Sequence, residues 1–148
     1  MESLHKLGAR KIAVTGMPPQ GCVPALAPSV DQCNETFNTF VGYHNFFLNV
    51  SVSLLNAVSE DSPYHILDLN SSFTAVFNSG KFATPYQPCC VVISKDARCG
   101  DVDSEGHPLY KVCDDTKSAF YWDDIHPTQA GWRAAYDLAL KHALEEIN

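Results

Sequence analysis

The 148-residue sequence lacks the features that direct a chain into a membrane or onto a nucleic acid. No apolar run approaches the roughly 18 residues of a membrane span, and residues 1–6 have no apolar segment of the kind found in signal peptides. Basic residues are few: 10 Lys and Arg stand against 17 Asp and Glu, giving a formal net charge of -7. Because nucleic-acid-binding proteins concentrate Lys and Arg, we expect no nucleic-acid partner and no membrane span.

The composition also lacks the marks of a disordered chain. Charged residues make up 18% of the sequence and hydrophobic residues 45%, a balance that is ordinary for a folded globular protein. This length suffices for one domain, or part of one, with a core that buries well over half of the unfolded surface. The sequence contains no internal repeat and no low-complexity segment. We expect no cofactor.

Cysteine, in contrast, is abundant, which is typical of proteins from an oxidising compartment. The six residues could pair in any of 15 ways. Structural zinc sites prefer ligands two to four residues apart, and because these cysteines lack that spacing, disulfides are favoured over a metal site. Cys22 and Cys33 are expected to form a local pair. Adjacent Cys89 and Cys90 are expected to bridge to different partners, because joining neighbours strains the bond geometry. The six are Cys22, Cys33, Cys89, Cys90, Cys99 and Cys113.

Three acceptor sequences for N-glycosylation agree with an exported protein. They begin at Asn34, Asn49 and Asn70. Together with the cysteines, they predict a secreted, extracellular protein. Since the chain shows no signal peptide, we expect that the N-terminal part of the exported protein is absent from this sequence.

Two apolar segments predict a parallel sheet. Residues 11–17 form a nearly continuous apolar run that is stopped by Pro18 and Pro19, which indicates a strand buried on both faces. Residues 64–69 form a second strand, and a helix between the two predicts a right-handed crossover. The loop at residues 18–30 leaves the carboxyl end of the first strand, where binding sites are built in open α/β sheets.

The helix between these strands is predicted to begin near Ser29, which has capping-box spacing to Gln32, and to run to Val58. Its apolar residues recur at helical spacing and are expected to face inward: Phe37, Phe40, Val41, His44, Phe47, Leu48, Leu55 and Val58. The opposite side is polar and is expected to face solvent, where Asn49 could carry a glycan: Asn38, Gly42, Asn45, Asn49, Ser53 and Asn56.

The second half of the chain is predicted to be irregular before a final helix. Residues 70–120 hold the last four cysteines and are expected to be stapled by them. Residues 101–106 imitate the start of a calcium loop, but the twelfth position is Val112 where a bidentate Glu is required, so we expect a solvated acidic loop. The final helix is predicted from an N-cap at Thr128 to Ile147.

Residues 122–128 place a carboxylate, Asp123, three residues before His126 and immediately before that helix. An Asp that orients a His and stabilises its positive charge is what a hydroxyl nucleophile needs in order to lose its proton. His5, His107 and His142 are expected at the surface, whereas His44 is expected at the core or its boundary. By spacing alone, two interpretations stay open: a catalytic pair, or an Asp123 that caps the local turn beside an incidental His126.

Two separated segments resemble the plant GDSL-type esterase/lipases, which are SGNH hydrolases. One runs from LGARK to GMPPQGCVP at residues 7–24, and the other is WDDIHPT at residues 122–128. The pairs Cys89-Cys90 and Cys99-Gly100 between them are similar to a cysteine-rich stretch of that family. The resemblance implies an α/β fold, a three-layer α/β/α arrangement with a flavodoxin-like parallel sheet. The sheet is expected to be incomplete, with its last two strands and flanking helices present, so that residues 1–148 are the C-terminal part of a single hydrolase domain.

The resemblance also implies hydrolysis of carboxylic esters, with a small-molecule or lipid ester as substrate. Asp123, and not Asp124, matches the family's aspartate, and His126 matches its base. The family's serine lies in a Gly-Asp-Ser-Leu block that this sequence does not contain, so we expect no nucleophile in this chain. The missing N-terminal segment of its own domain is the expected partner, and the chain alone is expected to be a poor esterase. The alternative is a non-catalytic, secreted, disulfide-stapled module that binds carbohydrate or protein.

Overall fold

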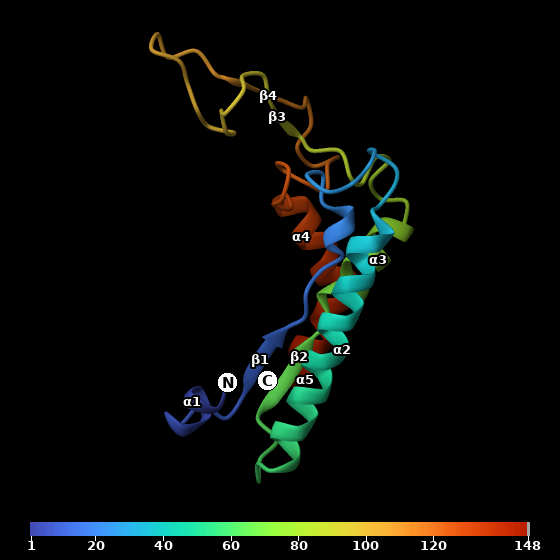
Figure 1. Ribbon diagram of the computed structural model, residues 1–148, viewed down its shortest axis with the longest axis vertical. Helices are drawn as coiled ribbons and strands as arrows, with labels where there is room; N and C mark the ends of the chain where they lie inside the picture. The colour runs from blue at the N-terminus through green and yellow to red at the C-terminus, as the bar shows by residue number, and fades with distance from the viewer. Residues whose placement is uncertain (148) are drawn as a thin grey trace.

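The computed structural model describes residues 1–147 and combines helices with two small sheets (Figure 1). No helix in this described part is both long and apolar enough to cross a membrane. The α-helices are α1 (Glu2–Lys6), α2 (Glu35–Ala57), α3 (Leu69–Asn78), α4 (Gln129–Ala135) and α5 (Lys141–Ile147). A 3-10 turn, η1 (Gln20–Cys22), and a π-helical segment, η2 (Tyr136–Leu140), complete the helices, and the strands are β1 (Ile12–Thr15), β2 (Tyr64–Leu67), β3 (Cys90–Val92) and β4 (Tyr110–Val112).

The predicted strand–helix–strand crossover is confirmed. Strand β1 pairs in parallel with β2, with Ile12 opposite Tyr64 and Thr15 opposite Leu67, and α2 connects them. Both strands are shorter than predicted. Strand β2 gives way to α3 because Asp68 accepts a hydrogen bond from the Ser71 amide and so caps that helix. Within the described chain, β1 has no neighbour besides β2, so its other edge is open.

The start of α2 differs from the prediction, because Asn34 and not Ser29 is its N-cap. The Asn34 side chain accepts hydrogen bonds from the amides of Thr36 and Phe37. The backbone amide of Asn34 donates to the Gly21 carbonyl at 2.7 Å. The Cys22–Cys33 disulfide closes the loop beside it. These contacts hold the preceding residues in a turn, in which Ser29 forms an isolated bridge with Gln32, and the helix begins only after it.

Part of each side of α2 is placed differently from the prediction. Asn45 accepts from the Met17 amide and donates to the Met17 carbonyl, each at 2.8 Å. Asn56 forms the same pair of bonds with the backbone of Tyr64. Asn45 and Asn56, which are predicted to face solvent, therefore hold the backbone at and just beyond the sheet, since amide side chains can hydrogen-bond backbone groups. Gly42, Asn49 and Ser53 are exposed as predicted.

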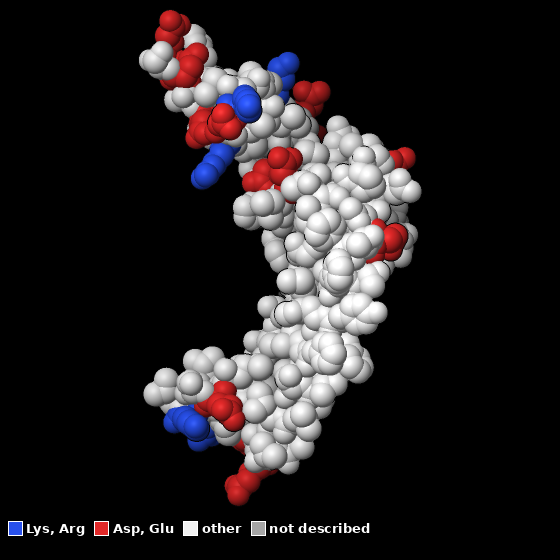
Figure 2. Space-filling model, in the orientation of Figure 1, with Lys and Arg blue, Asp and Glu red and all other residues white. Residues whose placement is uncertain are grey.

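Much of the predicted inward side of α2 is exposed instead, including Phe40, Phe47 and Val58. An apolar stripe with alternating spacings of three and four runs along it, with Phe40 and Phe47 each 63% exposed. We call this the α2 stripe: Phe40, Tyr43, Phe47, Val50 and Leu54. On the face drawn in Figure 2, Lys and Arg lie only toward the two ends of the molecule, and apart from an acidic patch on the right flank the surface between the ends is uncharged. The only charged residue in α2 is Glu35.

The main core lies where α3 packs against α4 and η2, which corrects the prediction that residues 70–120 are irregular. Phe120 is fully buried and stacks edge-on against Phe73 and Phe77, with ring centroids 5.0 and 4.8 Å apart. Val76 and Tyr121 complete this centre. The pattern at Phe73 and Phe77 is only one helical turn long, so the sequence signal for α3 is weak.

A disulfide-stapled arm, residues 89–113, extends away from the body and carries the antiparallel pair β3–β4 (Figure 1). Cys89 pairs with Cys113, and Cys90 pairs with Cys99, so the neighbouring cysteines bridge to different partners as predicted. The expected Cys22–Cys33 pair also forms. Asp103 accepts hydrogen bonds from the amides of Glu105 and His107, and this acidic segment is a turn of the arm.

The final helix begins at the predicted N-cap, and the buried Thr128 hydroxyl joins two segments there. It accepts a hydrogen bond from the Gly131 amide at 2.9 Å and donates one to the Ala119 carbonyl at 2.7 Å. The helix runs without a break to Ile147 as predicted, and the π-helical segment η2 lies between α4 and α5.

Replacing Thr128 by Val should lower the free energy of unfolding by about 1–2 kcal/mol, because the variant loses a helix cap and leaves the partly buried Ala119 carbonyl without its partner. Chemical denaturation of both proteins measures the difference. Thr84→Val is the matched control, since the exposed Thr84 hydroxyl bonds to no other described residue. Equal losses in the two variants would contradict this role of Thr128.

Candidate active site

The structure brings Asp123 and His126 together in one tight turn. Asp123 Oδ1 accepts hydrogen bonds from the amides of Ile125, at 2.9 Å, and His126, at 2.7 Å. Its Oδ2 lies 2.9 Å from His126 Nδ1. Asp123 therefore caps the turn and contacts the histidine ring at the same time. A ring that donates from Nδ1 to a carboxylate presents Nε2 as the proton acceptor.

Backbone hydrogen bonds from three segments hold this turn in place. The Trp122 amide donates to the His126 carbonyl at 2.7 Å and closes the turn on itself. From the arm, the Cys90 amide donates to the Trp122 carbonyl at 2.6 Å. From the loop after β1, the Ala25 amide donates to the Asp124 carbonyl at 3.0 Å. The contributions of Cys90 and Ala25 give no sequence signal, because any residue except proline can donate a backbone hydrogen bond.

The exposure of the two side chains differs in a way that suits a base and its orienting carboxylate. The His126 side chain is 73% exposed, whereas that of Asp123 is 27% exposed. Partial burial by itself would raise the pKa of Asp123. The hydrogen bonds from the His126 and Ile125 amides, and the contact with the His126 ring, outweigh that burial and hold the pKa below its usual value. Asp123 is thus ionised at neutral pH.

A cavity of about 440 Å³ adjoins the turn. Trp122 and Pro127, which flank the Asp–His pair in sequence, line one part of it, and Lys117 lines another. Within residues 1–147, no hydroxyl or thiol hydrogen-bonds the Nε2 atom of His126. The same residues contain no group of three or more His, Cys, Asp or Glu that could hold a metal ion.

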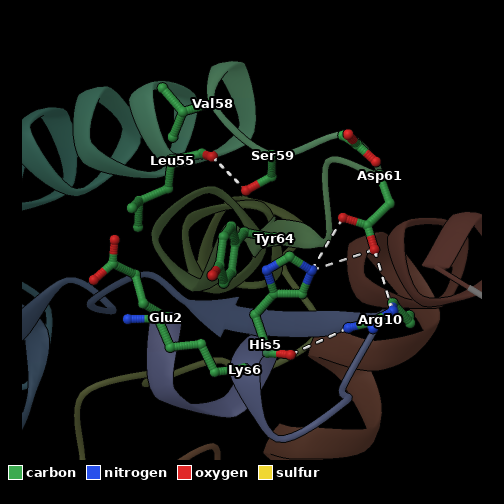
Figure 3. A pocket seen from close by; sticks show the side chains of 10 residues that line it. Glu2, His5, Lys6, Arg10, Leu55, Val58, Ser59, Asp61 and Tyr64 are labelled. Carbon is green, nitrogen blue, oxygen red and sulfur yellow. Dashed lines mark hydrogen bonds and ion pairs between the residues drawn. The ribbon is translucent and has the colours of Figure 1, made fainter.

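A second histidine–aspartate pair lies in a cavity of about 500 Å³ at the other end of the sheet (Figure 3). His5 Nε2 is 3.1 Å from Asp61 Oδ1, and Arg10 Nε is 3.6 Å from Asp61 Oδ2. His5 is therefore half-buried and paired, where the sequence predicts a surface position. Ser59 donates its hydroxyl to the Leu55 carbonyl and not to His5, so this cluster holds no activated serine (Figure 3). The sequence gives no signal for it, because the partners are 56 residues apart.

The predicted glycosylation sites lie on helices or at a helix start. Asn34 uses its side-chain oxygen to cap α2, Asn49 donates to the Asn45 carbonyl on α2, and Asn70 lies in the first turn of α3. Glycan attachment at the amide nitrogen would leave the capping oxygen of Asn34 in place. Their use as glycosylation sites stays a prediction.

An α/β chain with an aspartate–histidine pair on the loop before its last helix has the arrangement with which hydrolases activate a hydroxyl nucleophile. Comparison with known proteins agrees with this class. The family described as GDSL-like lipase/acylhydrolase matches residues 1–139. The chain therefore belongs to the GDSL-like lipase/acylhydrolase family.

Several curated relatives from Arabidopsis thaliana cover nearly the whole chain. It is 42% identical to GDSL esterase/lipase At5g03610 over 147 residues, which are 93% of this chain and 41% of the relative. It is 37% identical to GDSL esterase/lipase At3g09930 over 94% of this chain and 42% of that relative. The chain thus spans about two fifths of the length of these relatives.

In an NMR titration of the carboxyl carbons, Asp123 should titrate below the ordinary aspartate pKa of about 3.9. Because its pKa is lower in the folded state than in the unfolded state, the stability that it contributes is present above the unfolded value. That stability is lost as the pH falls through the lowered value. In His126→Ala, which removes the ring contact and retains the amide at position 126, the pKa of Asp123 should move upward. A value at or above about 3.9 in the unmodified chain would contradict this account.

Proposed function

We propose that this chain supplies the acid–base half of a carboxylic-ester hydrolase, with His126 as general base and Asp123 as the carboxylate that orients it. The observation that carries the proposal is the 2.9 Å contact between Asp123 Oδ2 and His126 Nδ1, in a chain of the GDSL-like lipase/acylhydrolase family. The exposed ring leaves Nε2 accessible to a second group. The lowered pKa of Asp123 keeps a negative charge beside the ring at neutral pH.

The proposed reaction is acyl transfer to a serine, followed by hydrolysis. His126 Nε2 takes the serine proton as the serine oxygen attacks the ester carbonyl, and the imidazolium that forms is stabilised by Asp123. The tetrahedral intermediate collapses when His126 returns this proton to the leaving alcohol. Water then attacks the acyl-enzyme with His126 again as base, which releases the acid and restores the serine.

The serine in this proposal comes from a segment outside this chain. The relatives are more than twice as long as the part that this chain matches. The open edge of β1 and the exposed α2 stripe are the surfaces on which such a segment would pack. Residues 1–148 would then be the C-terminal part of one hydrolase domain. In it, β1 and β2 would be the last two strands of a parallel sheet in a three-layer α/β/α fold.

The cavity beside the turn is the proposed place for part of the ester. Trp122 and Pro127 give it an apolar wall next to the catalytic pair, which suits the hydrocarbon part of a lipid or small-molecule ester. The three disulfides are consistent with a secreted, extracellular site of action for the full-length protein.

Hydrolysis of p-nitrophenyl acetate tests the proposal. The chain alone should show no serine-dependent turnover, and activity should appear when it is co-produced with the part of GDSL esterase/lipase At5g03610 that lies outside the match. In that complex, His126→Ala and Asp123→Asn should each lower kcat by about 10³-fold or more. Asp124→Asn is the matched control and should retain activity, because only the backbone of Asp124 is used to hold the turn.

Two results would overturn the proposal. One is turnover by the chain alone that is blocked by serine-directed inhibitors and lost in His126→Ala. The other is a complex whose activity is unchanged by His126→Ala.

The α2 stripe generates a separate prediction about association. Phe47→Asp places a charge in the middle of the stripe and should weaken binding of the co-produced segment by about tenfold or more, because a buried unpaired charge is costly. Pull-down and sedimentation velocity measure the effect. Val91→Asp, at an exposed position on the arm, is the matched control and should bind normally. Equal binding by both variants would exclude the stripe as the contact surface.

A further inference from the structure

A cavity of about 320 Å³ lies between α2, α3 and Tyr86, beside the Cys22–Cys33 disulfide. We call it the α2–α3 pocket. Its volume is within the range of about 300–1,000 Å³ that small-molecule sites occupy. It shares no lining residue with the cavity beside the Asp123–His126 turn, so it is not part of the candidate active site.

Polar side chains from both helices converge on this pocket. Asn70, Thr74 and Asn78 recur every fourth residue along α3 and therefore lie on one side of that helix. Glu35 lines the pocket from the first turn of α2. Among the described residues, none of these four side chains, nor the Tyr86 hydroxyl, forms a hydrogen bond with another residue. Their donors and acceptors are free to bind a ligand.

The wall of the pocket is held rigidly. Asn38 accepts a hydrogen bond from the Gly21 amide at 2.9 Å and contacts Cys22 Sγ at 3.5 Å. The disulfide joins the same loop to the residue before the α2 cap. Burial, followed by the negative charge of Glu35, raises the pKa of Tyr86, which is consistent with Glu35 and the phenol lying near each other. These contacts fix the loop and the start of α2 relative to each other, which lowers the entropic cost of forming this side of the pocket.

The lining suits a hydroxyl-rich ligand without negative charge. No Lys or Arg lines the pocket, so it offers no cation for a phosphate or carboxylate. A purely apolar ligand would leave the amides and the carboxylate unpaired. A sugar ring, however, has hydroxyls around its edge for Asn, Thr and Glu, and C–H groups on its faces for an aromatic ring such as that of Tyr86.

We propose that the α2–α3 pocket binds a pyranose sugar, with Asn70, Thr74, Asn78 and Glu35 as hydrogen-bonding partners and Tyr86 as the aromatic wall. This site is independent of the proposed ester hydrolysis. Its lining also includes no residue of the α2 stripe. Glu35, Asn38 and Gly42 line the pocket from one side of α2, and the stripe from Phe40 to Leu54 follows another.

Gly42 provides a sharp test, because it lines the pocket and a Cβ added there meets nothing within 4 Å. Gly42→Leu should fill the cavity without disturbing α2, since Leu is a better helix former than Gly. Gly42→Ala is its matched control, because a single methyl group leaves most of the space. Asn78→Ala removes one hydrogen-bonding partner, and Asn49→Ala makes the same change at an exposed position outside the pocket.

The first experiment titrates glucose, xylose and N-acetylglucosamine into the full chain produced without glycans, followed by amide chemical shifts in NMR. At least one sugar should shift residues of the α2–α3 pocket in a saturable way. Gly42→Leu should weaken binding by about tenfold or more, and Asn78→Ala by about fivefold. Gly42→Ala and Asn49→Ala should bind within about twofold of the unmodified chain. If the chain self-associates through the α2 stripe, the associated form is titrated.

The second experiment asks whether the sugar belongs to the chain itself, since Asn70 both lines the pocket and begins a glycosylation sequence. The protein is then produced with glycans. Nuclear Overhauser contacts between the first sugar on Asn70 and the Tyr86 ring would support the proposal, with the attached sugar as the ligand of the pocket. The proposal is overturned if neither an added nor an attached sugar contacts the pocket. It is equally overturned if sugar-induced shifts persist unchanged in Gly42→Leu.

Discussion

The carboxylate of Asp123 is the acceptor on which the candidate site depends. It accepts hydrogen bonds from the amides of Ile125 and His126 and contacts the His126 ring. One side chain therefore determines both the shape of the turn and the orientation of the ring. The two interpretations that the spacing leaves open are therefore structurally compatible. An aspartate that caps a turn is well placed to orient a histidine three residues later, because the capped amide and the ring belong to the same residue.

Three parts of the chain that are distant in sequence hold the Asp123–His126 turn in position. The arm contributes the Cys90 amide and the loop after β1 contributes the Ala25 amide, while Thr128 anchors the following helix to the segment before the turn. The disulfides hold two of these parts close to where they are needed. The cysteine-rich segment is thus a support for the proposed catalytic loop as well as a sign of an oxidising compartment.

The sequence predicts those features that follow from local pattern or chemistry. The crossover from β1 to β2, the N-cap at Thr128 and the pairing of Cys22 with Cys33 all depend on residues close in sequence or on strong periodicity. The orientation of α2 could not be predicted, because hydropathy counts Asn45 as a solvent-facing residue although its amide matches the backbone of Met17. The helix α3 has only a weak local pattern, and the pair of His5 with Asp61 depends on a contact that no local pattern encodes.

The two amide clamps of α2 have a mechanical consequence. The Asn45 side chain hydrogen-bonds the backbone just beyond the end of β1, and the Asn56 side chain hydrogen-bonds the backbone of the first residue of β2. Each clamp uses a donor and an acceptor together, so the helix can neither slide along the sheet nor roll about its axis without breaking bonds at both points. The position of the α2 stripe relative to the strands is consequently fixed. A segment that docks on it meets a surface whose register with the open strand edge is already set.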